Sequence, residues 1–213
     1  MEVPEQPPSK EECQRFRSLT LFSFMDYVKL QDNLDKALIG PQQLLSGTKV
    51  LTEASRESPA YLDRRHFPFW YHLGKQLPDI DRVMQVGPYL GLVGSCLLQS
   101  CSVAEWHVCS GGAYEITKSN IRLHSPKTET KFVSPEECGE IGLALITENC
   151  DLTHDPITEL FNLLWDCLAP EGLLVCDYIN SDAQGEAFED FCRVKNRESH
   201  TFKTRYGVGI IER

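Results

Sequence analysis

The sequence has few basic residues for its size. It carries 21 lysines and arginines against 31 aspartates and glutamates, which gives a net charge of −10 over 213 residues. Neutralising nucleic-acid phosphates requires clustered basic side chains, so this balance argues against a nucleic-acid partner. Stretches of about 18 apolar residues are also missing, so we expect neither a membrane span nor a membrane partner. The acidic, polar start of the chain is unlike a secretory signal, and we expect a cytoplasmic protein.

Paired cysteine motifs are absent, although the chain has nine cysteines. No two of them are spaced as Cys-x-x-Cys, so neither a zinc site nor a dithiol redox motif is indicated. Several, such as Cys167 and Cys176, lie in apolar segments, where a free thiol behaves as a small hydrophobic side chain. We therefore expect buried free thiols in a reducing compartment, without a local signature for a catalytic cysteine.

The common nucleotide-binding motifs are incomplete. The stretch RVMQVGPYLGLVGSCLLQ, at 82–99, begins like a strand and continues like a helix. Its glycines at 87, 91 and 94 do not have the GxGxxG spacing of dinucleotide-binding loops, and the lysine of a triphosphate-binding loop is lacking. Glycines at 87 and 91 permit positive φ and a close approach of the backbone to a ligand. The alternative is that they serve only a tight turn and close helix–strand packing, and both interpretations stay open.

Apolar periodicity divides the chain into two parts. Residues 1–60 form an N-terminal tail and helical segment, because 18–39 has helical spacing ended by Gly40 and Pro41. This helix offers a surface for a homodimer. In 61–213, strand and helix patterns alternate, which predicts an α/β domain with helices on both faces of a mostly parallel sheet. The expected strands are 82–86, 105–110, 130–134, 142–147, 172–178, 200–206 and 208–213.

Two features refine this expected sheet. The strands at 200–206 and 208–213 are separated by too little chain for a crossover helix, so they must be antiparallel. The segment 61–71 contains five aromatic residues, which either pack in the core or form a lid over a ligand cleft. His66 and His72 lie in or beside this segment and are candidates for lining such a cleft.

The glycine stretch resembles a known motif. MQVGPYLGLVGSCLL is similar to the first motif of class I S-adenosylmethionine-dependent methyltransferases, an apolar strand followed by a glycine-rich turn. GLALITENCDLTHDP and LAPEGLLVCDY resemble the later strand motifs of these enzymes, and TRYGVGIIER resembles their final hairpin. The small-molecule O-methyltransferases and the cephalosporin-hydroxylase-like group are the most similar. The resemblance implies a Rossmann-like, doubly wound sheet of seven strands that ends in an antiparallel hairpin.

The resemblance also implies a cofactor site. S-adenosylmethionine would lie over Gly87, Pro88, Tyr89 and Gly91, with Ser110 near the ribose. Two positions depart from the family. Gln85 replaces the acidic residue of the first strand, and Cys109 with Ser110 stands where an acid usually holds the ribose hydroxyls.

An acceptor site is implied at the ends of the neighbouring strands. Asp177 and His154 are the candidate catalytic residues, with neutral His154 as the base near pH 7. Asp151, Asp177 and Asn180 resemble the family's Mg²⁺ ligands, and hard oxygen ligands suit that ion. Other roles stay open: Asp151 and His154 could cap the following helix, and loop amides could satisfy Asp177.

Three functional classes follow from the sequence. The first is an S-adenosylmethionine-dependent methyltransferase that acts on a hydroxyl or amine of a small molecule. The second is a non-catalytic relative that uses the fold for binding or scaffolding, motivated by Gln85 and Cys109. The third is an oxidoreductase with a nucleotide cofactor.

Overall fold

The computed structural model describes residues 24–36, 39–50, 57, 63–109, 113–147 and 153–213. The strands are β1 (Ile80–Val86), β2 (Val103–Cys109), β3 (Glu129–Phe132), β4 (Ile141–Ile146), β5 (Leu168–Asp177), β6 (Ser199–Phe202) and β7 (Val208–Glu212). The helices are α2 (Phe24–Lys36), α3 (Pro41–Leu44), α6 (His66–Gly74), α7 (Leu92–Leu97), α8 (Tyr114–His124), α9 (His154–Cys167) and α10 (Asp182–Lys195). Two short 3₁₀ turns are η1 (Tyr89–Gly91) and η2 (Pro135–Glu137).

All seven strands form one sheet in the order β3-β2-β1-β4-β5-β7-β6. Strands β1 to β5 are parallel, and β7 pairs antiparallel with both β5 and β6. The predicted seven-stranded, doubly wound sheet with a terminal antiparallel hairpin is therefore confirmed. The strand order reverses between β1 and β4, and in sheets of this kind ligands bind beyond the carboxyl ends of the strands at such a point.

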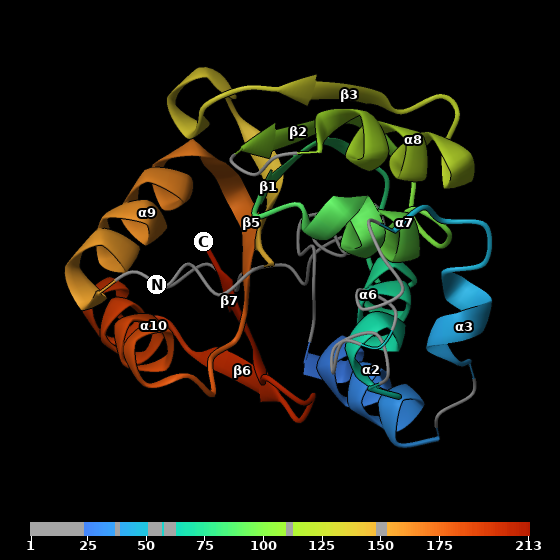
Figure 1. The fold of residues 1–213 in the computed structure, drawn as a ribbon. Coiled ribbons are helices and arrows are strands. Elements are labelled where there is room, and N and C mark those ends of the chain that lie inside the picture. Colours follow the sequence, from blue (N-terminus) through green and yellow to red (C-terminus); the bar gives the residue numbers. More distant parts are fainter. Residues whose placement is uncertain (1–23, 37–38, 51–56, 58–62, 110–112, 148–152) are drawn as a thin grey trace, which may run out of the picture.

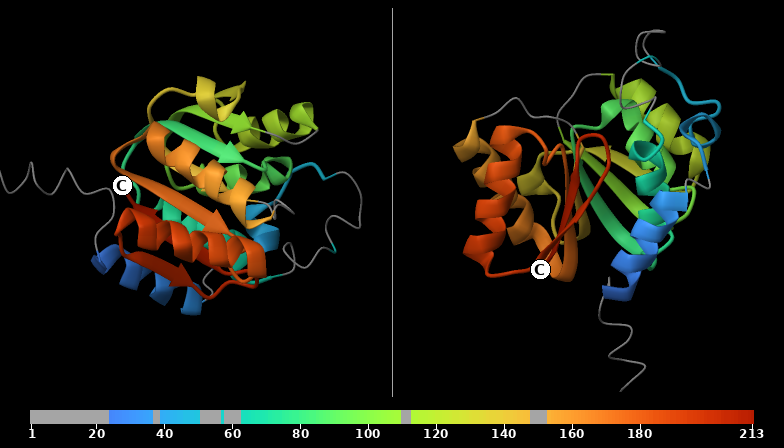
Figure 2. Two further views of the ribbon diagram at one scale, coloured as in Figure 1. Left: turned by 90° about the vertical axis from the view of Figure 1, so that its left-hand side faces the viewer. Right: turned by 90° about the horizontal axis from the view of Figure 1, so that it is seen from below.

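Two helical layers cover the sheet, as Figure 1 shows from one side and the right-hand view of Figure 2 shows from below. Helices α9 and α10 lie against one face, and α6, α7 and α8 against the other. Successive strand residues alternate between the layers: Val83 belongs to the cluster under α6 and α7, and Met84 to the cluster under α9 and α10. Because both of their faces are buried, the central strands β4 and β5 contain nearly continuous apolar runs.

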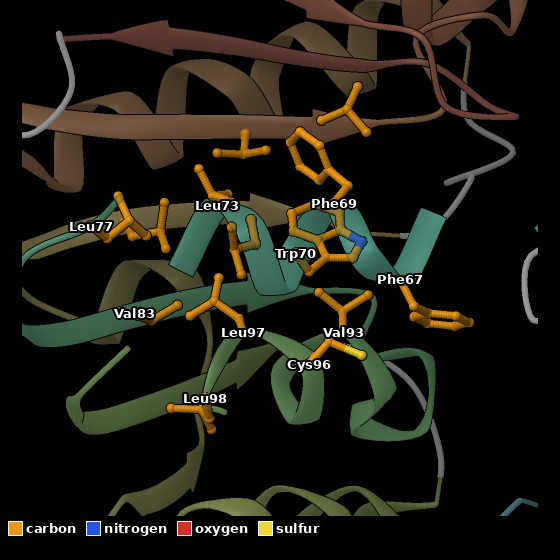
Figure 3. Close-up of a cluster of buried hydrophobic side chains, with 14 of the residues drawn as sticks. Phe67, Phe69, Trp70, Leu73, Leu77, Val83, Val93, Cys96, Leu97 and Leu98 are labelled. Atoms are coloured by element: carbon orange, nitrogen blue, oxygen red, sulfur yellow. The ribbon is translucent and has the colours of Figure 1, made fainter. Parts of the chain in front are cut away.

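Helix α6 is buried along almost its whole length, at eight of its nine residues. Figure 3 shows Trp70 and Leu73 of α6 beside Val93, Cys96 and Leu97 of α7. The two helices approach closely at Gly74, where the lack of a side chain leaves room for α7. A Cβ added to Gly74 would lie only 2.7 Å from the carbonyl oxygen of Leu97. The aromatic residues of this helix therefore pack in the core, as the first of the two interpretations proposed.

The N-terminal helical segment shares this core. Leu30 and Leu34 of α2 are buried in the same cluster as Leu44 and the aromatic side chains of α6. Pro41 starts the short helix α3, where a missing backbone N–H does no harm.

The expectations about membrane-spanning helices and about cysteines can be compared with the described residues. None of their helices combines the length and apolarity needed to cross a membrane. Their seven cysteines are free thiols, four of them buried and three half-buried. Cys13 and Cys150 lie outside the described part of the chain.

Candidate functional site

The glycine loop after β1 has left-handed backbone at four positions. Gly87 has φ +72° and Gly91 has φ +75°, and between them Tyr89 and Leu90 have φ +44° and +58°. Left-handed backbone costs roughly 1–2 kcal/mol at a residue with a Cβ. Tyr89 and Leu90 therefore hold a strained turn at the point where the strand order reverses.

Strained residues recur along the same edge of the sheet. Besides the pair after β1, Ala113 after β2 has φ +59° and Tyr178 after β5 has φ +62°. These positions follow the carboxyl ends of three parallel strands. Left-handed residues other than glycine cluster at ligand-binding sites more than elsewhere, so this edge is the candidate site.

Gln85 ties the glycine loop to the sheet through a buried polar network. The indole N–H of Trp106 on β2 donates to Oε1 of Gln85 at 3.0 Å, and Nε2 of Gln85 donates to the Thr147 hydroxyl at 2.7 Å. The Thr147 hydroxyl in turn donates to the carbonyl oxygen of Gly87. Gln85 is fully buried, so its amide positions the loop and does not face a ligand directly.

Gly91 is required by helix packing. A Cβ at this position would lie 2.7 Å from the carbonyl oxygen of Thr117 on α8. The amide of Asn120 on the same helix donates to the Leu90 carbonyl at 2.9 Å. Both contacts fix the loop against α8, which gives Gly91 a structural role besides the predicted cofactor contact.

At the tip of β5, Asp177 meets His66 from the first turn of α6. The Oδ2 atom of Asp177 lies 3.5 Å from Nδ1 of His66, and the side chains are 0% and 2% exposed. Oδ1 of Asp177 accepts the N–H of Tyr178 at 2.9 Å. Neither Oδ2 nor Nδ1 has a hydrogen-bond partner within the described residues.

Burial sets the charge of this pair. Burial lowers the pKa of His66 to about 4, although the Asp63 carboxylate acts in the opposite direction. Burial also raises the pKa of Asp177 well above its usual range, against the effect of the Tyr178 N–H. The short separation would suit an ion pair, but both shifts disfavour charge. Burial therefore favours the neutral form of each of the two residues.

Tyrosines surround the His66–Asp177 pair. The ring of Tyr206 meets that of His66 edge-on, with centroids 5.8 Å apart, and stacks on Tyr178 at 4.4 Å. Tyr89 of the glycine loop contacts Phe67, with ring centroids 6.1 Å apart. Residues from before β1, after β1, after β5 and before β7 thus converge at one end of the sheet.

The structure separates some of the residues that the sequence grouped. His154, at the start of α9, contacts Asp190 of α10 at 3.2 Å and Asp155 at 3.3 Å, whereas Asp177 contacts His66. Asn180 is exposed, and its Oδ1 packs against Gly207. The remaining candidates, Ser110 and Asp151, lie outside the described residues.

The described residues do not fit a magnesium site. Within them no group of three histidine, cysteine, aspartate or glutamate side chains is placed to hold a metal ion. Asp177 is fully buried against His66, while Asn180 is exposed.

Comparison with known proteins identifies the fold. The structure superposes on the S-adenosylhomocysteine-bound methyltransferase PaMTH1 of Podospora anserina with a TM-score of 0.51, 12% identity, and 99% and 98% of the two chains covered. It superposes on precorrin-6y C5,15-methyltransferase of Geobacter metallireducens with a TM-score of 0.53, 12% identity, and coverage of 70% and 87%. The chain has a methyltransferase fold. No family model and no curated protein matches its sequence.

Within this methyltransferase fold, sequence reasoning located the glycine loop and Asp177 but missed two relationships. His66 was a candidate for lining a cleft, and its pairing with Asp177 was not foreseen. The bonds of Gln85 to Trp106 and Thr147 were also unforeseen. No local pattern reveals either, because each depends on strands that are distant in the sequence.

Proposed function

We propose that the protein is an S-adenosylmethionine-dependent methyltransferase that acts on a hydroxyl or amine of a small molecule. The observation that carries this proposal is the left-handed glycine loop after β1, at the reversal of strand order. We place the cofactor over Gly87, Pro88, Tyr89 and Gly91, with Ser110 near the ribose. The fold that the chain shares with methyltransferases supports this assignment.

The acceptor is proposed to lie at the tip of β5, beside Asp177. Methyl transfer from a sulfonium to a hydroxyl or amine releases one proton from the acceptor, and a positioned base speeds such a step by about 10²–10⁴. His154 is the base expected from the sequence, and His66 is the histidine that contacts Asp177. We propose these two histidines as the candidates for the base. Once an acceptor is known, comparing His66→Gln with His154→Gln separates the two histidines, because only loss of the base lowers the rate in this range.

Cofactor binding is tested by isothermal titration with S-adenosylhomocysteine. The wild type should bind it, and Gly87→Val should not, because a side chain there would occupy the space of the ligand. Gly139→Val is the matched control. Gly139 also has a left-handed φ, +68°, but its Cβ would meet only the flexible end of Arg82. Folded wild-type protein that does not bind S-adenosylhomocysteine would contradict the proposal.

One observation favours a second function, a non-catalytic binding or scaffolding protein. Gln85 stands where the family has an acid, and both of its polar atoms are occupied by Trp106 and Thr147, so this position offers no side-chain group to a cofactor. The same titration separates the functions. Binding of S-adenosylhomocysteine supports the methyltransferase, binding of NAD(P) would indicate an oxidoreductase, and binding of neither would favour the scaffolding protein.

A further inference from the structure

Two segments beside the candidate site carry four exposed basic residues. Arg64 and Arg65 precede α6, and Lys203 and Arg205 lie in the turn between β6 and β7; all four are exposed. The two segments are joined directly, since Nη1 of Arg65 donates to the carbonyl oxygen of Lys203 at 3.2 Å. The cluster is therefore built by tertiary structure, from parts of the chain that are far apart in sequence.

Acidic side chains neutralise little of this cluster. Asp35 lies 3.9 Å from Arg65, and Oδ1 of Asp63 accepts the backbone N–H groups of Arg65 and His66. Arg64, Lys203 and Arg205 form no ion pair with any acidic side chain in the described part of the chain. Since the protein carries a net charge of −10, a local excess of positive charge is the exception on its surface. Such an excess attracts anions to the place where it occurs.

The position of the cluster connects it with the site. Val208, the first residue of β7, pairs with Asp177, so the turn before it lies at the carboxyl end of β5. The guanidinium carbon of Arg205 lies 5.8 Å from the centre of the Tyr206 ring, and Tyr206 contacts His66. The cations therefore border the His66–Asp177 pair and not a remote face.

We propose that the methyl acceptor is a small anion, whose carboxylate or phosphate group binds Arg205 and Lys203, with Arg64 and Arg65 adding to the positive field. This inference rests on the proposed methyltransferase function and specifies its substrate class. The anionic group lies at the β6–β7 turn, and the hydroxyl or amine that receives the methyl group points toward Tyr206 and the glycine loop. Arginine suits this task because its planar fork matches the geometry of carboxylate and phosphate oxygens.

Matched probes test the proposal. Binding of 4-hydroxybenzoate is compared with that of 4-hydroxybenzamide, and binding of phenyl phosphate with that of phenol, by isothermal titration with and without saturating S-adenosylhomocysteine. The anionic member of each pair should bind about tenfold more tightly, the value of one charge-assisted hydrogen bond. The difference should shrink at high salt, because these cations are exposed. The two pairs distinguish a carboxylate site from a phosphate site.

The double variant Lys203→Gln/Arg205→Gln should bring the ratio of affinities close to one. The substitution at Lys203 keeps the backbone carbonyl that Arg65 binds, and a thermal melt checks that the variant folds. The control is Arg122→Gln/Lys127→Gln, which removes the same charge from exposed positions at and beyond the end of α8. The control should keep the wild-type ratio.

Three results would overturn the proposal: equal binding within both probe pairs, binding of no probe, or a preference for anions that survives in the Lys203 and Arg205 variant. Loss of the proposed function is recognised separately, by the absence of S-adenosylhomocysteine binding. Anion binding without S-adenosylhomocysteine binding would overturn the assignment of the anion as a methyl acceptor.

Discussion

The Nδ1 atom of His66 lies 3.5 Å from Oδ2 of Asp177, and both side chains are buried. The contact joins the first turn of α6 to the tip of β5, at the end of the sheet where proteins with this strand order bind ligands. Burial shifts the two pKa values in opposite directions, and each shift disfavours the charged form of its residue. The pair can be examined through the pH dependence of stability, without knowledge of a substrate.

Asp177→Asn should gain stability relative to the wild type as the pH rises. The folded-state pKa of Asp177 is raised, so the folded carboxyl holds its proton more tightly than the unfolded one, whose pKa is about 3.9. This contribution is full below about pH 4 and is lost as the pH rises toward the folded-state pKa. The difference in melting temperature, variant minus wild type, should therefore increase from pH 4 upward, by at most about 3–5 °C per pH unit. Asp155→Asn, at an exposed position, serves as the control, and a difference independent of pH would contradict the assignment.

His66→Gln should lose less stability in acid than the wild type. The folded-state pKa of His66 is about 4, below the unfolded value of about 6.5, so the native protein loses stability as the pH falls between these values. Thermal melts from pH 7 to pH 4 measure this loss. His154→Gln is a control of opposite sign. The hydrogen bond to Asp155 raises the pKa of His154, so its contribution to stability is lost as the pH rises. The same pH slope for His66→Gln and the wild type would show that His66 is not held neutral.

Gln85→Leu should lower the free energy of unfolding by about 1–3 kcal/mol, because the buried indole N–H of Trp106 then has no partner. Urea denaturation measures the loss. Gln99→Leu removes a side-chain amide whose bonds to Leu44 and Ser95 lie nearer the surface, and it should cost less. If the free energy of unfolding falls equally in both variants, the buried network around Gln85 contributes no more to stability than the bonds of Gln99.

Gly91→Ala should destabilise the protein more than Gly47→Ala. Both glycines have similar left-handed φ values, +75° and +78°, so both substitutions carry the roughly 1–2 kcal/mol cost of that conformation. A Cβ on Gly47 makes only ordinary contact with Leu123 at 3.4 Å, whereas a Cβ on Gly91 would lie 2.7 Å from the Thr117 carbonyl oxygen. The difference between the two variants in urea denaturation isolates the steric part. Equal losses would mean that α8 moves aside freely.

The strands and their directions could be predicted from the sequence because each is encoded locally. Apolar runs such as LLVCD in β5 mark strands buried on both faces, and the short link through Gly207 forces the last two strands to be antiparallel. Boundaries were less accurate. Strand β5 begins at Leu168, four residues before the expected start, because Leu168 already pairs with Ile141 and the regular pairing with β4 resumes at Leu173 after an irregularity.

The candidate site was only partly predictable. The glycines at 87 and 91 predict a loop with positive φ, and both residues have positive φ in the structure. The side chains that contact Gln85 and Asp177 could not be predicted. The order of strands brings Trp106 and Thr147 to Gln85, and the packing of α6 brings His66 to Asp177. A histidine in an apolar helix resembles many core histidines. Only the tertiary contact with Asp177 distinguishes His66 from His72.

Strand β7, the last in the chain, occupies an interior position between β5 and β6. During synthesis, α6 leaves the ribosome long before this strand, yet its Phe69 packs against Phe202 of the hairpin, with ring centroids 5.3 Å apart. At a synthesis rate of 5–20 residues per second, the β6–β7 hairpin is made on the order of ten seconds after the apolar helix α6. Until then the edge of β5 is open and His66 lies beside an incomplete wall. The hairpin therefore reaches α6 late, and the wall beside His66 is complete only when β6 and β7 have joined the sheet.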